Sequence, residues 1–183
     1  MTDFLNTMLI SPAKIKEMSL TNINLDDVDL AASIRVSQKV YLRDVIGDAL
    51  LEKIQQLVYN AIKGLTPTIN DPENAMYKTL LDDYIKNVLA YKAVCEVCAR
   101  ISLKIRNIGV SKNSDTNIQA AQLSEIQSLR SEYETYFNDA ANRMIDFLKA
   151  NKDSFEEIVN DCPCGKKLPR LNAKYANNGL WLG

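Results

Sequence analysis

The chain has 183 residues, a net charge of −1 and an apolar content of 46%, which together predict one globular domain large enough to bury a hydrophobic core. This apolar content is too high for general disorder, and no apolar run approaches the roughly 20 residues that a membrane-spanning helix needs. We therefore expect a soluble, intracellular protein that neither spans a membrane nor binds nucleic acid through its overall charge.

The first 23 residues are expected to form an irregular N-terminal arm. They hold an apolar cluster that includes Phe4 and Leu5, and Pro12 interrupts it. Such an arm packs either on its own domain or on a neighbouring subunit, and the sequence leaves both alternatives open. Phe4 and Leu5 are therefore candidate interface residues.

A helix with a bend is predicted next. Asn24, with Asp27 three positions later, resembles a helix N-cap followed by an acid in the first turn. The helix is expected to bend near Val40 and to end at Gly47. Its inward side is predicted to carry Leu30, Ile34, Tyr41 and Val45.

A second helix of similar size follows directly. Asp48 is predicted to cap it, and Gly64 is predicted to end it, because glycine readily adopts the left-handed conformation that closes many helices. Its inward-facing residues are expected to be Leu51, Ile54, Val58, Ala61 and Ile62. Residues 65–71, LTPTIND, have the composition of a loop.

A long helix from Pro72 to Ile105 is the main predicted element. Pro72 and Glu73 suit a helix start, where proline loses no hydrogen bond and an acid meets the positive end of the helix dipole. The residues Asn107 to Gly109 are expected to stop it. One stripe recurs at steps of three and four residues, at Tyr77, Leu81, Tyr84, Val88, Tyr91, Cys95, Cys98, Ser102 and Ile105.

A second long helix is predicted from about Thr116 to Ala150, after a surface loop at 110–117. Its apolar stripe is Ile118, Leu123, Ile126, Leu129, Tyr133, Phe137, Ala140, Met144 and Leu148. One further capped turn is expected at 155–159, and no segment alternates like a β-strand. We therefore predict an all-α bundle of about four helices with two long antiparallel helices, comprising a helical domain at 1–161 and an extended C-terminal tail at 162–183.

The inventory of chemical groups points away from catalysis. The chain has no histidine, which excludes histidine-based triads, dyads and zinc sites. It has neither a GxxxxGK[ST] loop nor a GxGxxG turn for binding phosphates. Adjacent carboxylates on a helix point about 100° apart and share no site. We therefore expect no enzyme, no catalytic residue and no cofactor.

The four cysteines allow more than one interpretation. Cys95 and Cys98 form a CxxC pair, and Cys162 and Cys164 lie in a CPCG sequence, so a four-thiolate zinc site is arithmetically possible. Cys95 and Cys98 fall in the apolar stripe of the long helix, however, where free cysteine packs as a small hydrophobe. We therefore predict core packing for this pair and no metal site, and CPCG is either a turn that begins the tail or a redox pair.

The C-terminal tail has the composition of an interaction segment. After Cys162 it contains four bases and no acid, together with the only tryptophan of the chain. Aromatic anchors beside arginine are typical of interface hot spots. Three alternatives remain open for the tail: it packs on its own domain, binds another chain, or contacts nucleic acid through its lysine and arginine side chains. The candidate interface residues are Leu168, Arg170, Leu171, Tyr175, Leu180 and Trp181.

One sequence pattern resembles a known family. The run Gln38-x-x-Tyr41-Leu42-x-x-x-Ile46-Gly47-x-x-Leu50, and the later Ile105-x-Asn107-x-Gly109-Val110, resemble head–tail connector (head-completion adaptor) proteins of tailed bacteriophages. The pattern is similar to that of the ring proteins of crAss-like phages. The resemblance spans roughly residues 10–148, so the tail lies outside it.

The resemblance implies a structural virion protein, made in the host cytoplasm. Such proteins form a homo-oligomeric ring, commonly a dodecamer, between the portal protein and the tail or a second connector protein. The ring leaves a channel through which DNA passes without specific binding. The alternative is a helical adaptor or regulatory module that binds one protein partner through its C-terminal tail and forms no ring.

Overall fold

The computed structural model describes residues 3–18, 25–111, 116–159, 174–175 and 181–182. Within 103–111, 116–122 and the last two ranges it describes the backbone alone. The fold is an all-α bundle, as the sequence predicted. Its α-helices are α1 (Pro12–Met18), α2 (Asp27–Val36), α3 (Arg43–Ile46), α4 (Asp48–Lys63), α5 (Ala75–Thr79), α6 (Lys86–Ser111), α7 (Thr116–Ala150) and α8 (Glu156–Val159).

Two π-helical segments interrupt the α-helical path. The segment η2 (Ser37–Leu42) joins α2 to α3, and η4 (Leu80–Ile85) joins α5 to α6. Three short 3₁₀ helices complete the helical elements, η1 (Asp3–Asn6), η3 (Pro72–Asn74) and η5 (Lys152–Ser154). A π segment holds one extra residue in a turn, so it rotates every following side chain about the helix axis.

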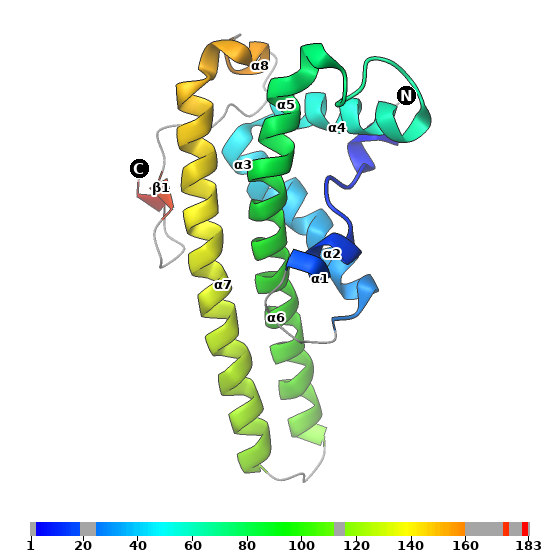
Figure 1. Ribbon diagram of the computed structural model, residues 1–183. Coiled ribbons are helices and arrows are strands. Elements are labelled where there is room, and N and C mark those ends of the chain that lie inside the picture. The colour runs from blue at the N-terminus through cyan, green and yellow to red at the C-terminus, as the bar shows by residue number, and fades with distance from the viewer. Residues whose placement is uncertain (1–2, 19–24, 112–115, 160–173, 176–180, 183) are drawn as a thin grey trace.

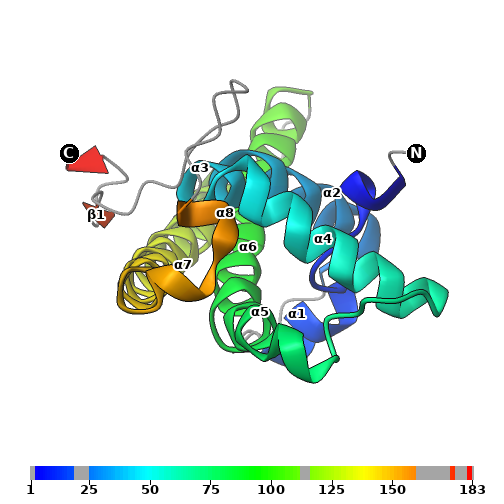
Figure 2. The same ribbon diagram turned by 90° about the horizontal axis from the view of Figure 1, so that it is seen from above.

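The two longest helices, α6 and α7, run antiparallel and side by side, as predicted (Figure 1). The bounds of α7 agree with the predicted 116–150. The predicted turn at 155–159 is present as α8, and Phe155 at its start is fully buried. Seen from above, α2 and α4 lie on one side of α6, and α7 lies on the other (Figure 2). The long pair thus forms the axis of the bundle.

The long predicted helical segment begins at Pro72, as expected. It extends farther along the chain than predicted, and a larger part of its surface is buried. It is a succession of η3, α5, η4 and α6, and it ends at Ser111. The predicted stop at Asn107–Gly109 is wrong, because a glycine inside a helix costs only about 1 kcal/mol and does not end it by itself. Between Val88 and Cys98 the helix is buried on several sides, since α2 packs on one side and α7 on another. A single stripe therefore underestimated its core face.

The α2–α3 region confirms the predicted bend and moves the predicted cap. The N-cap of α2 is Asp26, whose carboxylate accepts a hydrogen bond from Val28 N at 2.8 Å; Asn24 lies outside the described residues. The bend expected near Val40 is the π segment η2. The region ends at Gly47, as predicted, with φ 79° and ψ 170°.

Helix α4 follows the prediction except at its first residue and near its end. Its N-cap is Gly47, and Asp48 lies one position inside, paired with Arg43. Gly64 ends the helix in the left-handed conformation, as predicted. The prediction for Ile62 is wrong, because its side chain is 68% exposed. The buried apolar residues of α4 are Leu50, Leu51, Ile54 and Leu57.

The N-terminal arm packs on its own bundle. It contains the short helix α1, so it is less irregular than predicted, and Leu9, Ile10 and Ile15 belong to the hydrophobic core. Leu9 N donates to Gln38 Oε1 at 3.1 Å, and Gln38 Nε2 donates to Thr7 O at 2.8 Å. For residues 3–18 the alternative of docking on the parent domain is therefore the one observed.

The C-terminal tail contains two short strands that the sequence did not predict. Strands β1 (Lys174–Tyr175) and β2 (Trp181–Leu182) pair antiparallel, with Tyr175 opposite Trp181. Strand β1 lies against α7, on the side away from α6 in both views (Figures 1 and 2). Among the described helices, none combines the length and the apolar character needed to cross a membrane.

Candidate interaction surface along α6 and α7

Phe4 and Leu5, two predicted interface residues, are half-buried in η1, which packs against α4. Gln55 Nε2 of α4 donates hydrogen bonds to Leu5 O at 3.1 Å and to Thr7 O at 3.2 Å. The two residues therefore contribute to holding the arm on its own bundle.

The predicted interface residues of the tail are only partly within the described chain. Tyr175 and Trp181 face each other in the register of the β1–β2 pair. Leu168, Arg170, Leu171 and Leu180 lie outside the described residues, and so do Cys162 and Cys164.

Cys95 and Cys98 are buried in the core, as predicted from their place in the apolar stripe. Burial raises the pKa of both thiols above the usual value. The Cys95 thiol donates to the Arg130 carbonyl oxygen, with Sγ and O 3.7 Å apart. The described residues contain no cluster of three or more histidine, cysteine or acidic side chains that would hold a metal ion.

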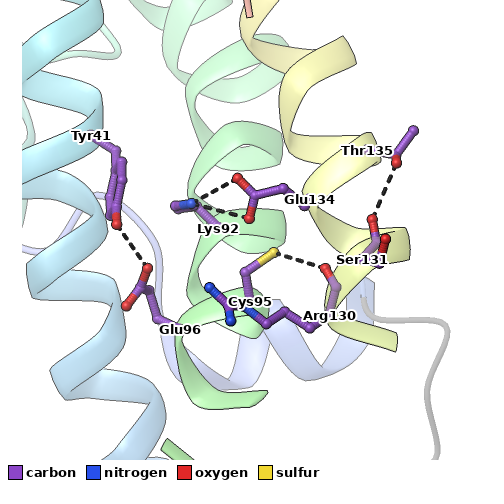
Figure 3. A network of polar contacts seen from close by, with 8 residues as sticks. All are labelled: Tyr41, Lys92, Cys95, Glu96, Arg130, Ser131, Glu134 and Thr135. Atoms are coloured by element: carbon purple, nitrogen blue, oxygen red, sulfur yellow. Dashed lines mark hydrogen bonds and ion pairs between the residues drawn. The ribbon is translucent and has the colours of Figure 1, made fainter. Parts of the chain in front are cut away.

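A polar network lies between η2, α6 and α7, and its centre is Lys92 (Figure 3). The Lys92 side chain is only 7% exposed, and its ammonium lies 3.0 Å from a Glu134 carboxylate oxygen. The same ammonium is 4.1 Å from the ring centre of Tyr41 and 4.8 Å from that of Phe137. The charge is thus compensated by one carboxylate and two aromatic faces.

Tyr41 of η2 makes a second contact with α6, through Glu96. Its hydroxyl donates to Glu96 Oε1 at 3.0 Å (Figure 3). Burial, together with the negative charge and hydrogen bond of Glu96, raises the pKa of Tyr41 to about 12. The tyrosine therefore stays a neutral donor at physiological pH, and the network ties η2, α6 and α7 into one register.

The network combines an ion pair with aromatic packing. Lys92 pairs with Glu134, and the aromatic rings of Tyr41 and Phe137 pack edge to face at 6.2 Å. Sequence analysis did not single out Lys92 or Glu134. The available signal was a lysine amid the apolar residues of α6, which predicts a buried cation in need of a partner.

One face of the α6–α7 seam carries a groove of about 350 Å³. The lining residues come from η4, α6 and α7: Asp83, Tyr84, Asn87, Tyr91, Tyr136, Asp139, Ala140 and Arg143. The π segment η4 carries two of them, Asp83 and Tyr84, onto this face.

The aromatic walls of the groove are fixed by ring packing. Tyr84 stacks on Phe147 with ring centres 4.4 Å apart. Tyr91 packs against Tyr136 at 5.6 Å, and Tyr133 beneath them contacts both rings. These contacts restrict the rings before any ligand arrives, which lowers the entropic cost of binding.

The charged groups of the groove are two carboxylates and one guanidinium. Asp83 and Asp139 are exposed, and Asp139 pairs with Arg143 at 2.7 Å. The Asp83 carboxylate forms no ion pair with another described residue. An exposed pair such as Asp139–Arg143 contributes under about 1 kcal/mol, so an incoming cation can replace it. The groove therefore combines tyrosine faces with carboxylates, which suits a cationic ligand.

Comparison with known proteins gives one family match, over residues 42–167, to a family of unknown function, DUF6712. The chain belongs to the DUF6712 family. No curated protein and no solved structure matches the chain. The DUF6712 match includes Lys92, Glu134 and every residue that lines the groove, whereas the N-terminal arm and Tyr41 precede it.

Proposed function

We propose that this DUF6712 protein is a structural subunit of a bacteriophage head–tail connector, assembled as a ring between portal and tail with a channel for DNA. The observation that carries the proposal is the long α6–α7 pair, because α2 packs on α6 whereas the groove is lined by residues of η4, α6 and α7 alone. A head-to-tail ring needs two different surfaces on each subunit, and a rigid pair of helices can carry them.

The chemistry of the described residues supports an assembly role. The two polar constellations on the seam are a paired ionic network and a tyrosine groove. Burial raises the pKa of the Cys95 thiol in the network, so this thiol stays protonated and is a weak nucleophile. The whole chain has a net charge of −1, so DNA would pass its surface without being held electrostatically.

The residues of the resemblance have structural roles that fit a rigid subunit. Gln38 fastens the N-terminal arm through two hydrogen bonds, and Tyr41 bonds to Glu96. Leu42, Ile46 and Leu50 are fully buried. Gly47 allows the sharp turn between α3 and α4.

Negative-stain electron microscopy tests the proposal directly. The purified protein is imaged alone and after mixing with a portal protein from the same genome. We expect rings of uniform diameter in at least the mixed sample. Monomers in both samples, with no co-migration with the portal in gel filtration, would contradict the connector role. A stable monomer or dimer that binds a single partner would instead favour the helical adaptor function.

A further inference from the structure

The groove on the α6–α7 seam is a preformed site with no occupant among the described residues. Its volume is about 350 Å³, and it offers Tyr84, Tyr91 and Tyr136 as walls. Asp83 and Asp139 lie at its edges, and the Asp139 carboxylate is shared with Arg143. This composition selects a positively charged, partly apolar chain segment.

Resting on the proposed ring, we propose that the groove of one subunit receives residues 166–170, Lys-Lys-Leu-Pro-Arg, from the C-terminal tail of a neighbouring copy. The segment carries three cations and one leucine within five residues, and no acid lies between Cys162 and Gly183. The carboxylates of the groove attract the cations, and the tyrosine faces contact the leucine, the proline and the stems of the basic side chains.

The dimensions of groove and segment agree. Along α6 the groove extends from Asp83 to Tyr91, which is about 12 Å at 1.5 Å per residue. Five extended residues span about 13 Å between their first and last Cα atoms. A proline within the segment favours an extended backbone, which lowers the entropic cost of binding.

The neighbouring copy is the favoured donor because groove and tail are two different surfaces of the same chain. A contact between unlike surfaces repeats from subunit to subunit and closes into a ring when its rotation allows. The subunit's own β1 lies on α7 on the side away from α6.

A fluorescent peptide provides the direct test. The peptide KKLPRLNAK, which is residues 166–174, is titrated with full-length protein at low ionic strength and followed by fluorescence anisotropy. All samples, including the one with the wild-type groove, carry Lys166→Glu, Lys167→Glu and Arg170→Glu, so that no tail of the protein itself competes with the peptide. We expect saturable binding that weakens about tenfold in the Asp83→Lys, Asp139→Lys double variant, because two attractive contacts become repulsive. The matched control is Asp146→Lys, an exposed acid of α7 outside the groove, which should bind the peptide like the wild type.

Mixing two complementary variants distinguishes binding of the tail to a neighbouring copy from binding of the tail to its own subunit. One variant carries Asp83→Lys and Asp139→Lys, and the other carries Lys166→Glu, Lys167→Glu and Arg170→Glu. Because each retains one intact surface, each should fail to oligomerise alone, and their mixture should form pairs in light scattering. All the changed groove residues are exposed, so circular dichroism should show unchanged helicity.

Each outcome decides the proposal. Absence of peptide binding to the wild-type groove, equal binding to the groove variant, or a mixture that stays monomeric would overturn it. Occupation of the groove by the subunit's own tail would appear as peptide binding together with a mixture that stays monomeric. Groove variants that still form rings with the portal would reject the groove and leave the connector role intact. Peptide binding without any ring would retain the groove and reject the connector.

Discussion

Lys92 of α6 contacts both Glu134 of α7 and Tyr41 of η2. The two members of the Lys92–Glu134 ion pair differ in solvent exposure. The Lys92 side chain is 7% exposed, whereas that of Glu134 is 21% exposed. Removing one member of a buried ion pair leaves the other uncompensated, and the cost grows with the burial of the group that remains. The two members of this pair should therefore tolerate substitution unequally.

Glu134→Leu should destabilise the protein more than Lys92→Met. The first leaves a buried ammonium without its carboxylate, at a cost of about 3 kcal/mol, and the second leaves a partly hydrated carboxylate, at a cost of about 1 to 2 kcal/mol. Urea denaturation followed by circular dichroism measures both, and the double variant should cost less than the sum. As a control, removing the exposed Lys14–Glu17 pair should change stability by less than about 0.5 kcal/mol.

The raised pKa of Tyr41 predicts a loss of stability in alkali. An unfolded tyrosine ionises near pH 10, whereas Tyr41 in the folded protein ionises at about 12. The folded state therefore holds its proton more tightly, and this contribution is complete below pH 10 and disappears as the pH rises through 12. The Tyr41→Phe variant should lose less stability than the wild type between pH 9.5 and pH 11.5, as measured by urea midpoints.

The decrease of stability with rising pH should not disappear entirely in the Tyr41→Phe variant. Burial and a 2.8 Å hydrogen bond to Glu157 also raise the pKa of Tyr77. A variant with the full wild-type slope would show that Tyr41 is not held neutral by the network.

The connections of α4 depend on two glycines in different conformations. Gly64 has φ 67° and ψ 28°, and a Cβ there meets no atom within 4 Å. Gly47 has φ 79° and ψ 170°, a region that is open essentially to glycine alone. Gly64→Ala should therefore cost about 1 kcal/mol, and Gly47→Ala should cost about 3 kcal/mol. Thermal unfolding of both variants tests this order, and equal costs would contradict it.

The positions of the helices along the chain could be predicted well from the sequence. The sides of each helix that are buried could be predicted only poorly. The stripe of α7 and the glycines at both ends of α4 are local signals, so they could be recognised directly. The extra residue of a π segment has no such signal, although η4 determines the side on which Tyr84 lies. Leu89 and Val94 are buried although they lie outside the predicted stripe, because burial from a second side depends on the packing of α2.

The groove could not have been predicted as a unit. Tyr91 and Tyr84 were expected to be core residues of one stripe, whereas both are half-exposed in the groove wall. Their companions Tyr136, Asp139 and Arg143 come from α7, and only the antiparallel register of the two long helices brings the two sets together. The sequence supplied instead the basic tail, which is the complementary half of the proposed contact.

At the scale of the whole molecule, charge predicts weak contact with DNA. The net charge is −1, and non-specific binding requires several unopposed cations facing the phosphates. We expect a dissociation constant weaker than about 100 μM for a duplex at physiological salt, measured by fluorescence anisotropy. Micromolar binding that falls steeply with salt would contradict a channel that releases its DNA.

The shape of the bundle predicts a gradient of stability along α6 and α7. Near Val88 to Cys98 the pair is enclosed by α2 and the core. Farther along, toward Ser111 and Thr116, the two helices continue beyond α2 (Figure 1). Amide hydrogens in a two-helix projection open more easily than those in an enclosed core. Hydrogen exchange in the free subunit should therefore be slow at 88–98 and faster at 100–111 and 116–128.

Assembly should change this gradient in a way that locates the contact. If rings form through the projecting helices, exchange at 100–111 and 116–128 should slow in the ring while the core stays unchanged. If the tail in the groove carries assembly, added protection should instead concentrate at 83–91 and 136–143. Equal exchange along α6 in the free subunit would contradict the enclosed core. A ring with no added protection in either region would place the contact between subunits on another face of the bundle.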